Sequence, residues 1–317
     1  EQAILSKQLA TIILDVPLEV EVREMEKLAP DREALEELFD ELEFRTYAKR
    51  VFGSAGKETE PAKEDAPADL FSSQGVEMPE SKYNDLQSTS HDYRLAEKPA
   101  ERKELIRMLS DAGGFCFDTE TTGLNANDTE LVGMSFSTEK GKAWYVPVPE
   151  NYQEALEVVA EFKALFEDEK TQKTGQNLKF DIAVLKWYEI EVQGPLFDTM
   201  IAHYLIEPDL RHNMDFLAET YLDYRPVPIE KLIGKKGKNQ KSMRTAEPGM
   251  IKDYACEDAD ITLQLKEVFE PMLKETATMD LFEKIEMPLV PVLAAMEAEG
   301  VKLETETLER FSVELLE

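Results

Sequence analysis

The chain has 317 residues, enough for two domains or for one domain with appended segments, and its 42% hydrophobic content is enough for a real core. A formal net charge of -30 counts against nucleic-acid binding through a generally basic surface, so any such contact has to be local. Cys116 and Cys256 lie far apart in apolar segments, which gives no disulfide framework and favours a reducing cytoplasm, and the sequence has neither a membrane-length apolar run nor a signal-peptide pattern.

Residues 1–53 predict a small structured piece. The stretch from Leu9 to Val20, LATIILDVPLEV, is typical of a strand followed by an extended segment. Asp31 can cap a helix. The apolar residues of that helix recur at helical spacing: Ala34, Leu35, Leu38, Phe39 and Leu42. Because about fifty residues are too few for an independent core, we interpret this piece as the end of a domain whose larger part is missing.

Residues 54–90 differ in composition from the segments on either side. They are rich in Glu, Asp, Pro, Ala and Ser and poor in large apolar residues. Such a segment buries too little surface to offset its ordering entropy, so we predict an acidic flexible linker between domains. An acidic docking peptide around Leu70 and Phe71 is the alternative.

Residues 91–275 carry the main predicted domain. We expect these elements in chain order: a helix around 104–109, a strand at 115–117, strands at 131–137 and 143–148 joined by a hairpin loop at 139–141, a helix at 151–166, a short strand at 173–177 and a helix at 178–187. Three antiparallel strands followed by alternating helix and strand are typical of an α/β domain of the ribonuclease-H-like type, in which helices flank a mixed sheet.

The strand at 115–117 leads into two acids, Asp118 and Glu120. Side chains two apart in an extended chain point the same way, so both carboxylates can face one point in space. A strand that ends in two such carboxylates suits an oxygen-lined site for Mg²⁺ or Mn²⁺. Solvated acids at a strand end are the alternative, and the choice depends on whether further acids arrive in suitable settings.

Two further acids meet that condition. Asn177 and Asp181 are four residues apart at a strand-to-helix switch and are predicted to share a helical face. Tyr254 and Asp258 have the same spacing, which places a tyrosine one turn before the last acid. The combination favours one site over a set of unrelated surface acids.

The neighbours of Asp258 divide into two kinds. We predict that Glu257 and Asp260 are surface groups. The other neighbours are largely apolar: Cys256, Ile261, Leu263 and Leu265.

Three stretches carry a resemblance to a known family: FCFDTETTGL from Phe115, TGQNLKFDIAVL from Thr174 and YACEDADITLQL from Tyr254. Together, and in their spacing, they resemble the three motifs of the 3′→5′ proofreading exonuclease domain of bacterial DNA polymerase I. The flanks are similar to the same family, since residues 1–53 resemble the last part of its 5′-nuclease domain and residues 276–317 resemble the first helices of its polymerase domain. Because the chain stops before any palm motif, we expect no polymerase activity.

The resemblance implies roles for the acids and the tyrosine. Asp118, Glu120, Asp181 and Asp258 match the four metal-binding carboxylates of the family, which implies two divalent cations, Mg²⁺ or Mn²⁺, with Zn²⁺ as an alternative at one site. Tyr254 matches a tyrosine that helps to position the attacking water. An unperturbed tyrosine has a pKa of about 10, so we favour Tyr254 as an orienting hydrogen-bond partner over a full base.

The resemblance also implies contacts with the substrate. Leu124 matches a residue that wedges against the terminal bases, and Gln176, Asn177 and Arg211 match residues near the bound strand. The family places an aromatic side chain before a Gly-Lys run. The nearest residue here is Ile229, with a one-residue length difference after it, so that role is not assigned.

The stretch from Lys231 to Arg244, KLIGKKGKNQKSMR, contains six basic residues and no acid. One interpretation is a strip that meets the phosphates of a single strand, with Lys235, Lys236 and Lys238 as candidate contacts. A solvated flexible loop is the alternative. The strip, if functional, is the local basic contact that the acidic chain requires.

The resulting prediction is a proofreading 3′→5′ exonuclease that hydrolyses phosphodiester bonds at single-stranded or frayed DNA 3′ ends and releases nucleoside monophosphates. It is expected to be a monomer that acts with the rest of a polymerase in cis, in DNA replication and repair. Two alternatives stay open: a module that holds frayed 3′ ends without cleaving them, and a structural connector between a 5′-nuclease and a polymerase. A metal-dependent degradation assay separates the first prediction from both.

Overall fold

The computed structural model describes residues 34–35, 38–39, 83–235, 237 and 240–316. The chain divides into two units, Glu1–Val76 and Glu77–Glu317. In the first unit the described residues, among them Ala34 and Leu38, are helical, in agreement with the predicted helix. The predicted strand at 9–20, the Asp31 cap, Leu42 and the docking peptide around residues 70–71 lie outside the described residues.

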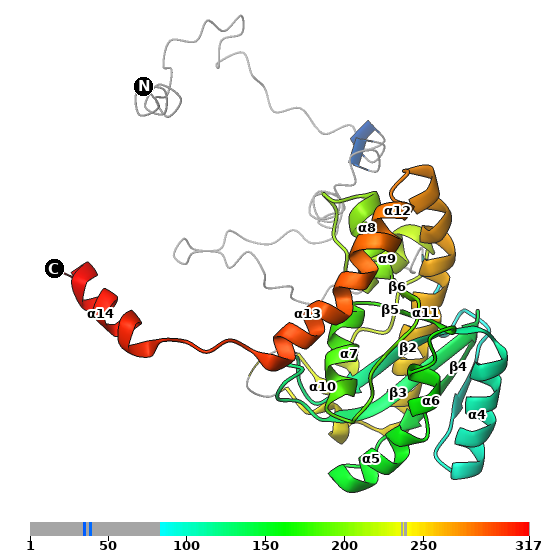
Figure 1. Cartoon of the computed structure of the whole chain (residues 1–317). Coiled ribbons are helices and arrows are strands. Elements are labelled where there is room, and N and C mark those ends of the chain that lie inside the picture. Colours follow the sequence, from blue (N-terminus) through cyan, green and yellow to red (C-terminus); the bar gives the residue numbers. More distant parts are fainter. Residues whose placement is uncertain (1–33, 36–37, 40–82, 236, 238–239, 317) are drawn as a thin grey trace, which may run out of the picture. The chain divides into compact units, whose positions relative to one another are not determined.

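A six-stranded mixed sheet organises the second unit (Figure 1). Its spatial order is β1-β4-β3-β2-β5-β6. The strands are β1 (Asp92–Leu95), β2 (Gly114–Thr121), β3 (Leu131–Glu139), β4 (Lys142–Pro147), β5 (Gln172–Gly175) and β6 (Leu196–Asp198). The central strands β2, β3 and β4 pair antiparallel, as predicted, whereas β1, β5 and β6 each pair parallel with a neighbour.

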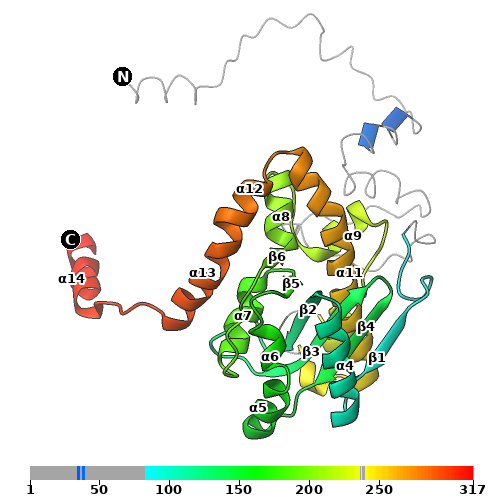
Figure 2. The same cartoon turned by 45° about the vertical axis from the view of Figure 1, so that its right-hand side comes forward.

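Helices cover both faces of this sheet. They are α4 (Pro99–Asp111), α5 (Tyr152–Ala160), α6 (Lys163–Phe166), α7 (Leu178–Lys186), α8 (Thr199–Ile206), α9 (Met214–Tyr221), α10 (Glu230–Ile233) and α11 (Pro248–Glu275), with a 3-10 turn, η2, at Met243–Thr245. Figures 1 and 2 show α11 running along the face opposite to α4 and α6. The prediction of an α/β domain with a mixed sheet flanked by helices is confirmed.

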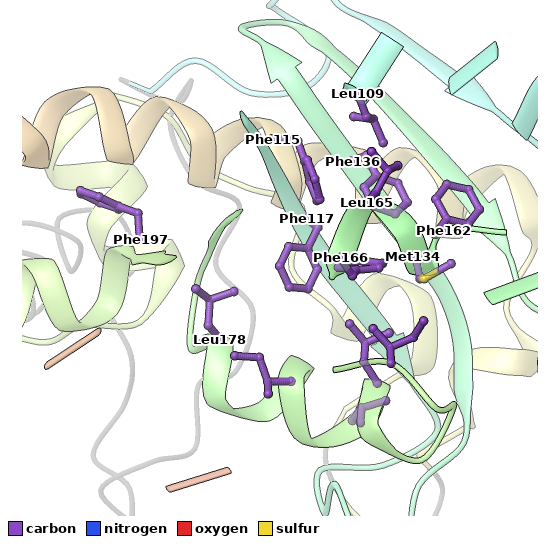
Figure 3. Close-up of a cluster of buried hydrophobic side chains, with 14 of the residues drawn as sticks. Leu109, Phe115, Phe117, Met134, Phe136, Phe162, Leu165, Phe166, Leu178 and Phe197 are labelled. Atoms are coloured by element: carbon purple, nitrogen blue, oxygen red, sulfur yellow. The ribbon is translucent and has the colours of Figure 1, made fainter. Parts of the chain in front are cut away.

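The strand β2 is buried on both sides, which explains its unbroken apolar start. Phe115 and Phe117 enter the main core, where the Phe117 and Phe166 rings meet edge to face at 5.0 Å between centroids (Figure 3). Such an aromatic pair contributes about 0.5–1.5 kcal/mol beyond its buried area. Cys116, between them, is also fully buried, and the strand that carries it contacts α11. Asp118 and Glu120 alternate in phase with Cys116, so they project toward α11.

The predicted single helix at 151–166 is wrong, because the structure breaks it into α5 and α6. Asn151 caps α5 by accepting hydrogen bonds from the amides of Gln153 and Glu154. After the break, Phe162, Leu165 and Phe166 are all buried, and Phe162 stacks on a phenylalanine of β3 at 5.2 Å. The interruption turns all three side chains into the core.

Glu257 and Asp260 of α11 are not surface groups, which corrects the prediction. Glu257 is 0% exposed and Asp260 is 4% exposed. The Glu257 carboxylate accepts a hydrogen bond from the Tyr224 hydroxyl at 2.6 Å. Asp260 accepts from the Tyr93 hydroxyl at 2.8 Å and from the Gly141 amide at 2.9 Å. Buried carboxylates need such partners, and these come from segments far away in the sequence.

The chain continues after α11 through further helices: α12 (Met279–Leu281), a π-helical turn η3 (Phe282–Glu286), α13 (Met287–Glu299) and α14 (Thr305–Leu316). The helix α13 packs against α7, and the Lys179 ammonium forms an ion pair with Glu297 at 2.5 Å. Among the residues that the structure describes, no helix is both long and apolar enough to cross a membrane.

Candidate active site

Three carboxylates from two elements meet at one end of β2. One ligand oxygen from each of Asp118, Glu120 and Asp258 lies within 4.8 Å of the others. Alternation along β2 turns Asp118 and Glu120 toward α11, and Asp258 lies on the α11 side that faces the sheet. A register shift between Glu120 and Thr121 marks a bulge, a feature that often re-aims a side chain next to a functional site.

These carboxylates are costly to ionise without a counter-charge. Burial raises the pKa of Asp118 to about 7. Burial, and then repulsion from Asp118, raises the pKa values of Glu120 and Asp258 well above their ordinary range. The Oε1 atom of Glu120 is buried and has no hydrogen-bond partner. A cluster of hard oxygen ligands with an unsatisfied buried oxygen fits a divalent cation such as Mg²⁺ or Mn²⁺.

Asp181, the fourth predicted acid, approaches from α7 and stands outside that close group. One of its oxygens accepts hydrogen bonds from the Thr119 amide at 3.1 Å and from the Thr119 hydroxyl. The strands β2 and β5 pair only as far as Cys116, so the Thr119 amide on that edge is left for a side chain. Thr119 was not among the predicted site residues, because strand alternation alone points its side chain away from those of its acidic neighbours.

Tyr254 lies one turn before Asp258 on α11, and both side chains line the same cavity. Burial, followed by the charge of Asp258, raises the pKa of Tyr254 above its ordinary value of 10.0. A hydroxyl with a raised pKa stays protonated at neutral pH. It is therefore suited to donating or sharing a hydrogen bond and unsuited to acting as a full base.

A cavity of about 740 Å³ opens over these groups. Its lining includes all five predicted catalytic residues together with Leu124 and Gln176. Leu124 is 90% exposed and lines this cavity, so its side chain is free to contact a ligand there. A hydrogen bond within the loop stabilises the backbone next to Leu124, because the Thr129 hydroxyl accepts from the Gly123 amide at 2.7 Å.

The other predicted strand contacts differ in their placement. Gln176 lines the cavity, and its amide nitrogen donates to the His212 carbonyl at 2.8 Å. Asn177 does not share a helical face with Asp181, which corrects the prediction, because it precedes α7 in the left-handed region with φ 64°. Arg211 is exposed and does not line the cavity. The roles of Asn177 and Arg211 toward a strand stay predictions.

Four apolar side chains that carried no assigned role also line the cavity: Phe180, Ile229, Ile233 and Met243. Ile229 is 37% exposed and stands where the resemblance placed an aromatic residue. Phe180 immediately precedes Asp181 in the second motif, and that position was the only signal that could have identified it. Phe180 and Ile229 both contribute apolar surface to the wall of a cavity that also contains the acidic side chains.

The basic strip is described only in part. Lys235 is exposed, Lys241 lines the cavity, and Lys236 and Lys238 lie outside the described residues. Arg244, at the end of the strip, donates to two backbone carbonyl oxygens and forms an ion pair with an acid at 3.3 Å. Arg244 is therefore an anchor of the strip, and its guanidinium is already engaged within the fold.

The fold is a mixed sheet flanked by helices, and its central strand β2 carries two acids that face a third acid on α11. This arrangement is that of a ribonuclease-H-like nuclease with a cluster of carboxylates suited to metal binding. The 3′-5′ exonuclease family matches residues 93–274, more than half of the chain. The chain belongs to this family, and it carries a 3′-5′ exonuclease domain of the DNA polymerase I type.

Individual relatives agree with this assignment. The DNA polymerase I of Pseudomonas aeruginosa is 34% identical over 322 residues, which cover 97% of this chain and 33% of that protein. Several curated relatives match nearly all of this chain, and the chain spans only about a third of their length. Brucella melitensis NrnC is 21% identical with a TM-score of 0.53, covering 67% of this chain and 94% of NrnC. Pol1 of M. smegmatis is also 21% identical with a TM-score of 0.53, covering 70% of this chain and 34% of that chain, and both show the same fold.

Proposed function

We propose that this domain hydrolyses the last phosphodiester bond of single-stranded or frayed DNA 3′ ends and releases nucleoside monophosphates. The observation that carries the proposal is the close group formed by the partly buried Asp118 and the buried Glu120 and Asp258, which line an open cavity. The structural relatives add support, since NrnC has been solved both with bound Mg²⁺ and bound to pGG. Pol1 is described in complex with a DNA primer-template.

In this proposal the carboxylates of Asp118, Glu120, Asp181 and Asp258 hold two divalent cations, Mg²⁺ or Mn²⁺, with Zn²⁺ as an alternative at one site. Such ions supply stabilisation of charge on the attacking and leaving oxygens of the phosphodiester. The protein supplies the rest of the site. Burial of Glu120 and Asp258 keeps their oxygens fixed, and the Thr119 contacts hold Asp181 beside β2.

A direct assay tests the proposal. A single-stranded oligonucleotide labelled at its 5′ end should shorten to a descending ladder with Mg²⁺ or Mn²⁺, and EDTA should stop the reaction. A paired blunt end should be cut far more slowly, because its last bases are not free to enter the cavity. Release of label as a mononucleotide in the first turnover would indicate attack from the 5′ end, and this would contradict the proposal.

Tyr254→Phe should slow single-turnover cleavage on the order of 10²–10³-fold, the usual cost of losing one positioned donor, while leaving Mn²⁺ affinity nearly unchanged. The phenylalanine keeps the ring and all the carboxylates and removes only the hydroxyl. Tyr93→Phe is the matched control, because the Tyr93 hydroxyl binds the α11 carboxylate of Asp260, outside this cavity. Loss of metal binding in Tyr254→Phe would assign the tyrosine a different role.

Leu124→Ala should weaken the binding of a 3′ end about 10- to 100-fold, which corresponds to losing the burial of one leucine side chain against the terminal bases. The maximal single-turnover rate should change much less, since the acidic centre is untouched. Leu210, which is 36% exposed and does not line the cavity, gives the control variant Leu210→Ala. Equal DNA affinity in the two variants would show that Leu124 does not contact the substrate.

The proposal extends to the organisation of the chain. Residues 91–275 are the exonuclease domain, residues 1–53 are the remnant of a 5′-nuclease domain, and residues 54–90 are the linker. Residues 276–317 begin a polymerase domain that acts in cis during DNA replication and repair. The alignment with DNA polymerase I of Pseudomonas aeruginosa over 97% of this chain supports this arrangement.

A further inference from the structure

Two buried residues, Asp198 at the end of β6 and Thr199 at the start of α8, contact the turn between β5 and α7. We propose that they are positioning residues for the exonuclease centre: together they fix the turn that brings Gln176 and Asp181 to the cavity. This inference rests on the proposed function, and it concerns residues outside the three sequence motifs. Neither side chain lines the cavity itself.

The Asp198 carboxylate is fully buried and accepts hydrogen bonds from four backbone amides. Two belong to the start of its own helix, Met200 at 2.9 Å and Ile201 at 3.2 Å. The other two belong to the start of α7, Asn177 at 3.2 Å and Leu178 at 2.7 Å. One carboxylate therefore caps two helices, and its charge lies at the favourable end of both helix dipoles.

The start of α7 depends on this external cap. Asn177 occupies the N-cap position of α7, and its own side chain makes no capping hydrogen bond. Its backbone is left-handed, with φ 64°, a conformation that costs a non-glycine residue free energy and persists only where its surroundings hold it. The hydrogen bonds from the Asn177 and Leu178 amides to Asp198 stabilise this left-handed conformation.

Thr199 holds the other side of the same turn. Its buried hydroxyl shares its one proton between the Gly175 carbonyl oxygen, at 3.2 Å, and the side-chain oxygen of Gln176. The Gln176 nitrogen donates to the His212 carbonyl, so both ends of this amide are fixed where it lines the cavity.

The turn between β5 and α7 also packs closely against β2, the strand that carries Asp118 and Glu120. A Cβ atom at Gly175 would lie 3.2 Å from the Phe117 carbonyl oxygen, one residue before Asp118, which shows how closely the turn approaches β2. Asp181 then follows in the first turn of α7, where its carboxylate meets Thr119. A shift in the first residues of α7 moves Asp181 with them, because the helix is rigid over one turn.

The test compares Asp198→Asn with Asn151→Ala. Asn151 also caps a helix through two amides, but its helix, α5, does not line the cavity. Both variants should lower the melting temperature. Only Asp198→Asn should raise the Mn²⁺ concentration needed for half-maximal single-turnover cleavage, about 10- to 100-fold, and speed the hydrogen exchange of residues 177–181 in the metal-free protein.

Thr199→Val keeps the shape of the side chain and removes the hydroxyl, so it provides an answer if Asp198→Asn does not fold. It should weaken the binding of a 3′ end and speed hydrogen exchange at residues 175–178, with a melting temperature close to that of the unchanged chain. The inference is overturned if each of the two variants that folds resembles Asn151→Ala in its metal dependence, DNA binding and hydrogen exchange in this turn, whatever its melting temperature.

Exchange and Mn²⁺ binding can be measured without DNA, which separates this inference from the proposed function. A chain that binds Mn²⁺ but cleaves nothing contradicts the proposed function, whereas the exchange data would still decide whether Asp198 and Thr199 fix the turn. An active chain whose Asp198 and Thr199 variants keep normal metal dependence contradicts the inference alone.

Discussion

Asp258→Ala is expected to reduce single-turnover cleavage by on the order of 10³-fold or more and to weaken Mn²⁺ binding at the same time. The loss should be at least as large as that expected for removing one positioned donor. Asp258 is the α11 member of the three-carboxylate group, and without it Asp118 and Glu120 on β2 remain as an incomplete ligand set. Both the occupancy of the site and its stabilisation of transition-state charge should fall.

The matched control for this variant is Asp253→Ala. Asp253 also lies on α11, but it pairs with its neighbour Lys252 and does not line the cavity. It should keep a nearly normal rate and metal affinity, since exposed ion pairs contribute little. Normal cleavage and unchanged Mn²⁺ titration in Asp258→Ala would remove the carboxylate group from the mechanism.

Without metal, the chain is expected to become less stable relative to Asp118→Asn as the pH rises from about 4 to about 7. The folded state raises the pKa of Asp118 to about 7 from an ordinary value of 3.8, so the folded chain binds this proton more tightly than the unfolded chain. That stabilisation is complete below the unfolded pKa and is lost as the pH rises through the folded pKa. Burial and repulsion from Asp118 also raise the pKa values of Glu120 and Asp258, and both groups are present in the two chains that are compared.

The measurement is the melting temperature in EDTA at several pH values, for the unchanged chain and for Asp118→Asn. Taking the difference cancels the opposite trend of His203, whose pKa is lowered by burial to about 4. At pH 8 the variant should be more stable by on the order of 1–3 kcal/mol, or several degrees, because one pKa unit corresponds to about 1.4 kcal/mol. A difference that does not depend on pH would contradict the assignment of Asp118 to a repelling cluster.

Added Mg²⁺ or Mn²⁺ at pH 8 should reverse this ranking. A cation that binds the folded state alone raises the melting temperature of the unchanged chain by mass action, and it should raise that of Asp118→Asn much less. This arm uses stability as its readout and needs no nuclease activity.

The sequence alone determined the centre of the site. The alternation of an extended chain is a local property, so the buried run at 115–117 was enough to turn Asp118 and Glu120 to one side. The four-residue spacing of Tyr254 and Asp258 was likewise enough to put them on one face of a helix. The antiparallel strands β2 to β4 followed from their own apolar patterns and the short hairpin loop between two of them.

Only the tertiary structure decided which polar groups are buried and what they contact. Glu257 and Asp260 look like surface acids until Tyr224 and Tyr93 arrive from distant segments to pair with them. Asn177 was predicted to share a helical face with Asp181 across the strand-to-helix switch, because the local sequence does not show that the carboxylate of Asp198 holds Asn177 in a left-handed conformation. Burial and hydrogen-bond partners are set by chain segments that are remote in sequence, so local patterns place the catalytic acids while the fold supplies the groups that hold them.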